Sequence, residues 1–167
     1  MTDRTLVLLR HAKSDWSNDD VDDLHRPLAG RGERQAPEAG RWLAGNIDGI
    51  DLAVVSPAAR ARATWDLASG ELDRPPRTVV DDRVYEASVD DLLTVVREIE
   101  PEVLTVVLVG HNPSFEDLAS TLSGQAVTMK TSALAVLTLS GSWSSSGPGS
   151  ALVRHSGRPP GPRSQES

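Results

Sequence analysis

The chain of 167 residues contains no cysteine, which excludes disulfide bridges, thiolate metal sites and thiol nucleophiles. Aromatic residues make up only 4% of it, too few for the stacking platforms of proteins that bind single-stranded nucleic acid. No apolar run approaches the ~20 residues of a membrane-spanning helix, and Met1-Thr2-Asp3-Arg4 lacks the layout of a signal peptide. We therefore expect a cytoplasmic protein that binds neither nucleic acid nor membrane.

Positive charge is also in short supply, because 17 Lys and Arg face 24 Asp and Glu for a formal net charge of −7. This balance argues against a broad basic surface but leaves room for a local basic pocket. The length suits one domain with a single large core, which we place at residues 1–155. The remaining residues, 156–167, are rich in Pro, Gly and Ser and are predicted to form a disordered tail.

Continuous apolar runs of strand length are abundant, and such runs are typical of strands buried on both faces. Segments with the 3.6-residue spacing of buried helix faces separate them, among them 89–99. This alternation predicts an α/β fold, a three-layer α/β/α sandwich with a mostly parallel central sheet. The strong strand candidates are 5–9, 51–55, 103–109 and 133–139, and the weaker ones are 78–80 and 151–153. A Ser- and Gly-rich segment at 141–149 fits a hairpin connection between the last two strands.

Proline marks the expected helix boundaries. Ser56-Pro57 and Asn112-Pro113 each resemble a capping residue followed by proline in the first turn, so a helix should begin at each. Pro37 lies inside a third helical pattern, at 36–43, and should kink or interrupt that helix.

Histidine and arginine follow the predicted strands at the points where the strands end. Arg10 and His11 follow the first, Arg60 lies one helical turn beyond the second, and His111 follows the third. Ligands of open α/β sheets bind at the carboxyl ends of the strands, so these side chains should meet at one edge. Arginine pairs suit phosphate, and a histidine there can attack phosphorus.

No carboxylate cluster accompanies these residues, so we expect the protein to neutralise phosphate without a metal or other cofactor. Arg60 and Arg62 lie two positions apart on one helix and point ~200° away from each other, so only one can face the phosphate. Arg60 is our candidate, with Arg62 as a solvated partner for nearby acids.

Three motifs resemble those of the histidine phosphatase superfamily, whose fold is phosphoglycerate-mutase-like. Leu8-Leu9-Arg10-His11-Ala12 is similar to its Arg-His-Gly signature with alanine in place of glycine, and the other two are the arginine motif at 56–64 and Val109-Gly110-His111-Asn112. The compact length, Arg10-His11-Ala12-Lys13-Ser14, Arg26-Pro27-Leu28 and Lys130-Thr131-Ser132-Ala133 resemble the SixA-type phosphohistidine phosphatases. The resemblance spans about residues 5–154.

The resemblance implies that His11 is the nucleophile of a covalent phosphohistidine intermediate, and that Arg10, Arg60 and His111 form the phosphate pocket. Glu86 occupies about the position of the catalytic acid of larger relatives and is either that acid or a loop residue. Lys13 and Ser14 are candidate substrate-binding donors beside the nucleophile. The substrate implied is a phosphorylated protein. A small phosphoester, such as a sugar phosphate or a nucleotide, and a non-catalytic phosphate-binding module are the alternatives. His25 and His155 are expected to be surface or packing residues.

Overall fold

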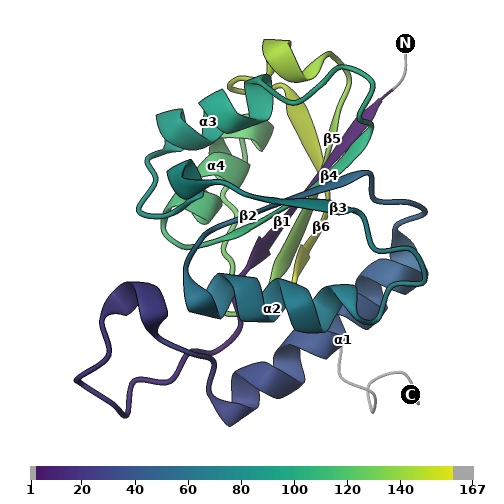
Figure 1. The fold of residues 1–167 in the computed structure, drawn as a ribbon. Coiled ribbons are helices and arrows are strands. Elements are labelled where there is room, and N and C mark those ends of the chain that lie inside the picture. The colour runs from purple at the N-terminus through teal and green to yellow at the C-terminus, as the bar shows by residue number, and fades with distance from the viewer. Residues whose placement is uncertain (1–2, 160–167) are drawn as a thin grey trace.

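The computed structural model describes residues 3–159 as a six-stranded sheet covered by helices on both faces, which confirms the predicted three-layer fold (Figure 1). The strand order is β3-β2-β4-β1-β5-β6. Neighbouring strands from β3 to β1 are parallel, whereas β5 is antiparallel to both β1 and β6. The strands are β1 (Arg4–Arg10), β2 (Leu52–Val55), β3 (Arg77–Val80), β4 (Thr105–Gly110), β5 (Leu134–Leu139) and β6 (Ala151–Gly157).

Two hydrophobic cores lie on the two faces of the sheet, because successive side chains of a strand point to opposite faces. Leu6 and Leu8 of β1 pack with helices α3 (Val89–Arg97) and α4 (Ser114–Ser123). Val7 and Leu9 pack on the opposite face with α1 (Gly30–Asn46) and α2 (Ala59–Ser69). Burial on both sides explains why these strands are continuous apolar runs in the sequence.

Helix boundaries differ from the predicted ones at two places. Helix α2 begins at Ala59, with Ala58 rather than Ser56 as its N-cap residue. Helix α4 begins at Ser114 with Pro113 as its N-cap residue, although the Asn112 side chain still accepts a hydrogen bond from the Glu116 backbone N–H at 3.3 Å. Both strand-to-helix turns are therefore longer than predicted.

Helix α1 runs without interruption from Gly30 to Asn46, so Pro37 does not break it. The proline leaves the Glu33 carbonyl without its intrahelical partner, and Glu33 lies on the exposed face, where water can replace the missing donor.

The strand β6 extends to Gly157, which moves two residues of the predicted tail into the sheet. Beyond Pro159 the predicted tail lies outside the described residues. Residues 141–149 do connect β5 to β6, and they contain a short 3-10 helix, η3 (Trp143–Ser145).

The carboxyl ends of β1, β2 and β4 lie together, because Arg10 is paired with Gly110 and Val55 with Val109. The loop from residue 11 to residue 29 leaves this edge and carries the 3-10 turn η1 (Asp23–His25); it extends from the body of the domain at the lower left of Figure 1.

Candidate active site

A cavity of about 260 Å³ opens at this edge of the sheet. Its wall is largely basic and polar, and its lining residues are Arg10, His11, Lys13, Ser14, Trp16, Asp23, Arg60, His111, Asn112 and Thr131. A larger cavity of about 310 Å³ lies near the amino ends of β2 and β3, is lined by residues 44, 47–50 and 72–74, and contains no histidine. The predicted convergence of strand-end residues therefore occurs at the smaller cavity.

His11 is buried, and its ring is fixed by the chain itself. Its Nδ1 lies 2.8 Å from the Ala12 carbonyl oxygen. A carbonyl can only accept, so Nδ1 must carry the proton and Nε2 keeps a free lone pair. Burial, followed by the charges of Arg60 and Arg10, lowers the pKa of His11 to about 4. At neutral pH the ring is uncharged and its Nε2 is a competent nucleophile.

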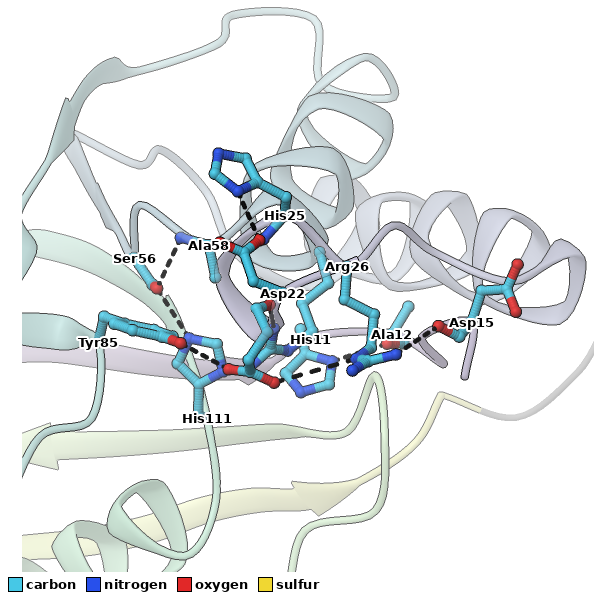
Figure 2. Close-up of polar contacts among 12 residues, drawn as sticks. His11, Ala12, Asp15, Asp22, His25, Arg26, Ser56, Ala58, Tyr85 and His111 are labelled. Atoms are coloured by element: carbon cyan, nitrogen blue, oxygen red, sulfur yellow. Dashed lines mark hydrogen bonds and ion pairs between the residues drawn. The ribbon is translucent and has the colours of Figure 1, made fainter. Parts of the chain in front are cut away.

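His111 lies beside His11, with 5.2 Å between the ring centroids. Its Nε2 is 2.7 Å from Ser56 Oγ and its Nδ1 is 3.4 Å from Arg60 Nη2. Arginine can only donate, so Nδ1 accepts and the Nε2–H donates to the serine. Burial is the main cause that lowers the pKa of His111 to about 3, and the ring is neutral in the free protein. Figure 2 shows the rings of His11, His111 and Tyr85 converging on one region.

Arg60 is held by the turn η1. It is only 7% exposed, and it donates from Nη1 to the Asp23 carbonyl at 2.6 Å and from Nη2 to Asp23 Oδ2 at 3.0 Å. The Tyr85 hydroxyl donates to the same carboxylate oxygen at 2.6 Å. These hydrogen bonds lower the pKa of Asp23 and raise the pKa of Tyr85 to about 12. The Asp23 carboxylate is therefore hydrogen-bonded to the Arg60 guanidinium, the group to which a phosphate would bind.

Arg10 is anchored by the loop that precedes β5. Its Nη1 donates to the Met129 carbonyl at 3.0 Å, and the Asn112 side chain donates to the same oxygen at 2.8 Å. The Glu116 carboxylate accepts from the Met129 backbone N–H at 2.7 Å, and the Ser132 N–H donates to the Arg10 and His11 carbonyls. Helix α4 thus fixes the loop, and the loop fixes the arginine.

Lys13 and Ser14 both line the cavity, Lys13 as an exposed residue and Ser14 as a buried one. Gly32 of α1 makes this placement possible, because an added Cβ would lie 2.1 Å from the Lys13 carbonyl oxygen. The segment that follows the nucleophile therefore packs directly on the helix backbone.

Glu86 is exposed, adopts a positive φ of 54° and is not part of the cavity wall. Its assignment as a general acid stays a prediction from the resemblance. Its neighbour Tyr85 instead contacts Asp23 and lies 5.6 Å from the His111 ring, centroid to centroid.

The remaining sequence candidates lie outside the cavity wall. Arg62 is exposed, as its helical phase relative to Arg60 predicts. His25 pairs with Asp22 at 2.6 Å on the surface, and His155 stacks on Trp42 with 4.3 Å between ring centroids.

Several residues of the site were not identified as site residues from the sequence. Ser56 and Asn112 were assigned to helix caps, Thr131 was noted only within a motif, and Asp23, Tyr85 and Trp16 were not singled out. Ser56 carried a usable signal, because it directly follows β2, and the strand register puts it level with Arg10 and Gly110, one residue before His111. Asp23, Tyr85 and Trp16 lie in loops or short 3-10 turns, where the sequence has no periodic pattern from which the direction of a side chain could be predicted.

Within residues 3–159, no group of three or more His, Asp or Glu side chains is arranged to hold a metal ion. None of the helices in that range combines the length and the apolar character needed to cross a bilayer.

The fold and the cavity define an α/β protein with a largely basic and polar ligand site at the carboxyl ends of its parallel strands. Comparison with known families makes this specific: the histidine phosphatase superfamily (branch 1) matches residues 6–127. The chain belongs to this superfamily and is a phosphatase.

Relatives of known sequence include an uncharacterized protein of Mycobacterium tuberculosis, 36% identical over 156 residues that cover 87% of this chain and 96% of the relative. A chloroplastic uncharacterized protein of Arabidopsis thaliana is 31% identical over 160 residues, covering 87% and 73%.

Two solved structures share the fold closely. The candidate phosphohistidine phosphatase SixA of Nakamurella multipartitia superimposes with a TM-score of 0.82 at 29% identity and covers 95% of this chain and 98% of its own. The protein histidine phosphatase SixA complexed with tungstate has a TM-score of 0.80 at 23% identity, with coverage of 93% and 97%; that likeness concerns the fold.

Proposed function

We propose that this phosphatase removes the phosphoryl group from phosphohistidine on a protein. The observation that carries the proposal is the neutral, buried His11, whose Nδ1–H is held by Ala12 and whose free Nε2 belongs to a cavity lined by Arg10 and Arg60. The 29% identity to the SixA-type structure over nearly the whole of both chains supports the choice of substrate.

The reaction proceeds in two transfers. In the first, the lone pair of His11 Nε2 forms a bond to phosphorus while the bond from phosphorus to the substrate nitrogen breaks. The leaving imidazole keeps that electron pair and takes up a proton from solvent. In the second, water attacks phosphorus, the bond to Nε2 breaks with its electrons returning to His11, and the water releases one proton. The products are the substrate protein with an unphosphorylated histidine side chain and inorganic phosphate.

The arginines stabilise the charge of the transferring group. Arg10 and Arg60 supply cationic donors that stay charged at every physiological pH. Both guanidiniums are fixed by protein carbonyls before substrate arrives, so little reorganisation is needed during transfer. Once Asp23 yields Arg60 to the phosphate, His111 Nδ1 no longer has to accept from Arg60. The ring can then take up a proton at Nδ1 and donate it to a phosphate oxygen, while its Nε2–H stays on Ser56. Lys13 and Ser14 are placed in the wall to contribute further donors.

A substrate panel tests this function. Wild-type protein and His11→Ala are assayed on a phosphohistidine protein, a sugar phosphate and a nucleotide. We expect phosphohistidine to be hydrolysed with the highest kcat/KM and His11→Ala to be inactive on all three. Acid-labile label on wild-type protein after incubation with a labelled phosphodonor would support the intermediate. Preference for a small phosphoester would contradict the substrate, and absence of label and turnover would indicate a binding module.

Turnover should not depend on a divalent cation. The arginines supply the positive charge that a metal supplies in other phosphatases, so incubation with EDTA is expected to leave kcat unchanged. Loss of activity that Mg²⁺ or Zn²⁺ restores would contradict the proposed charge neutralisation.

A further inference from the structure

Trp16 is an exposed tryptophan in the wall of the candidate active site. Its side chain is 60% exposed, although tryptophan is usually largely buried. Among the residues that line the cavity, it is the one with a large apolar side chain. An aromatic surface left open beside otherwise polar groups is typical of a ligand contact, because rings bury large area at low cost in conformational entropy.

The ring is held in place from one side. The Arg26 guanidinium carbon lies 3.8 Å from the centroid of the Trp16 ring, a cation–π contact. Arg26 is itself only 8% exposed, and its Nη1 donates to the Asp15 carbonyl at 3.3 Å. One ring face is therefore covered by a fixed group, so the exposed area belongs to the opposite face and the edges.

We propose that Trp16 is a stacking platform for the ring of the leaving group, which is the imidazole of phosphohistidine if the proposed function holds. Trp16 and His11 line the same cavity of about 260 Å³. A phosphoryl group placed for attack by His11 Nε2 therefore leaves its substituent inside a space that Trp16 bounds. A planar ring gains contact on the open face of the indole, whereas an amine or a short alkyl group gains little.

Paired substrates test this platform without interference from leaving-group chemistry. N-phosphoimidazole and phosphoramidate both present a phosphorus–nitrogen bond, and only the first carries a ring. Phenyl phosphate and ethyl phosphate form the matching oxygen-linked pair. For each substrate, the quantity compared is the ratio of kcat/KM between wild type and variant, so differences in intrinsic reactivity cancel.

Trp16→Ala is expected to lower kcat/KM about 5- to 10-fold on the ring-bearing substrates, the scale of one aromatic stacking contact. It should change the ringless substrates by less than twofold, and Trp16→Phe should restore most of the loss. The matched control is Leu152→Ala, because Leu152 of β6 is also apolar and similarly exposed (58%). It lies far from the cavity, since its partner on β5, Thr138, pairs with Thr5 at the amino end of β1. It should be neutral on all four substrates.

An equal loss on ringed and ringless substrates, or no loss on either, would overturn the platform. Failure of the proposed function looks different: the wild type would cleave phenyl phosphate but neither phosphorus–nitrogen compound nor a phosphohistidine protein. The phenyl and ethyl pair would then still decide whether Trp16 binds a ring.

Discussion

Burial and charge act in the same direction on the two histidines of the site. Removal from water disfavours the imidazolium, and the neighbouring arginines repel it. The same arginines that we propose to bind the phosphate thus help to keep the His11 lone pair free of a proton. A phosphate bound between them reverses the local field, so His111 can become a better donor once the substrate is present.

Arg60 and Arg62 provide a matched pair on one helix. Arg60→Ala should lower kcat about 10²-fold or more, the usual cost of removing a preorganised donor from a transition state. Arg62→Ala should be close to neutral because its side chain is exposed and outside the cavity wall. Steady-state kinetics on a phosphohistidine protein measure both. Equal losses of kcat in the two variants would show that the direction in which each arginine points from the helix does not determine which of them binds the phosphate.

Asp23 competes with phosphate for Arg60. Replacing Asp23 with Asn removes a negative charge from the cavity and weakens the contact at 3.0 Å. We expect Asp23→Asn to bind inorganic phosphate about 3- to 10-fold more tightly, the scale of one partly screened ion pair. Calorimetric titration measures this affinity. Asp22→Asn is the control, because Asp22 is bonded to His25 on the surface. Weaker binding to Asp23→Asn would indicate that Asp23 organises Arg60 rather than blocking it.

The strand-end residues of the site could be predicted because strand direction alone determines where they meet. Arg10, Arg60 and His111 needed only the position of each apolar run and the topology rule for parallel sheets. Asp23, Tyr85 and Trp16 could not, because their positions depend on how the loop 11–29 and the segment after β3 fold over that edge. Local spacing contains no information on such long-range contacts.

At the scale of elements, helices α1 and α2 pack with their backbones unusually close. A Cβ added at Gly40 of α1 would lie 2.1 Å from the Ala68 carbonyl oxygen of α2. Gly40 has ordinary helical backbone angles, so glycine is needed there because it has no side chain and not because of an unusual φ. This contact holds the C-terminal turn of α2 against α1, and Arg60 lies at the other end of the same helix.

Two glycines of α1 therefore respond oppositely to the same change. Gly40→Ala should lower the free energy of unfolding by about 1–3 kcal/mol, because the two helices must separate. Gly45→Ala, which meets nothing within 4 Å, should raise it by up to ~1 kcal/mol through helix propensity. Urea denaturation measures both. Stabilisation by Gly40→Ala would contradict the close approach.

Element types followed from the sequence more reliably than element ends. The continuous apolar runs identified the buried strands, including β1 and β4. The starts of α2 and α4 were misplaced because Ser56 and Asn112 bond to site groups or loop carbonyls as well as to local backbone. The C-terminal end of β6 was missed because its pairing with β5 overrides a Gly- and Ser-rich composition.

For the molecule as a whole, a net charge of −7 coexists with a basic cavity. The acidic surface opposes nonspecific binding of polyanions, while the local field of the arginines still attracts a phosphoryl group. The choice of substrate therefore depends on contacts in the cavity and at its rim and not on the overall charge of the protein.

Stability should fall in mild acid. The folded-state pKa values of about 4 for His11 and about 3 for His111 lie below the usual 6.5, so between pH 6.5 and 4 the unfolded chain binds more protons. The free energy of unfolding should therefore decrease by a few kcal/mol, on the order of magnitude set by these shifts, as the pH falls through this window. Urea denaturation at a series of pH values measures it.

The double variant His11→Asn, His111→Asn is the control for this pH dependence. It should flatten the curve between pH 6.5 and 4, where the paired carboxylates such as Asp23 still remain ionised. An unchanged slope would show that other groups cause the acid sensitivity.

The central position of β1 separates two kinds of motion. Its residues are hydrogen-bonded on both edges, to β4 and to β5, so amide exchange from Leu6 to Leu9 requires opening of the whole sheet. The turn η1, which carries Asp23, contains no buried residue, so no fully buried apolar side chain opposes its opening, and chiefly the hydrogen bonds of Asp23 with Arg60 and Tyr85 must break. The mouth of the cavity can therefore fluctuate many times between events that disturb His11, and admission of the proposed protein substrate need not compromise the alignment of the nitrogen proposed to attack.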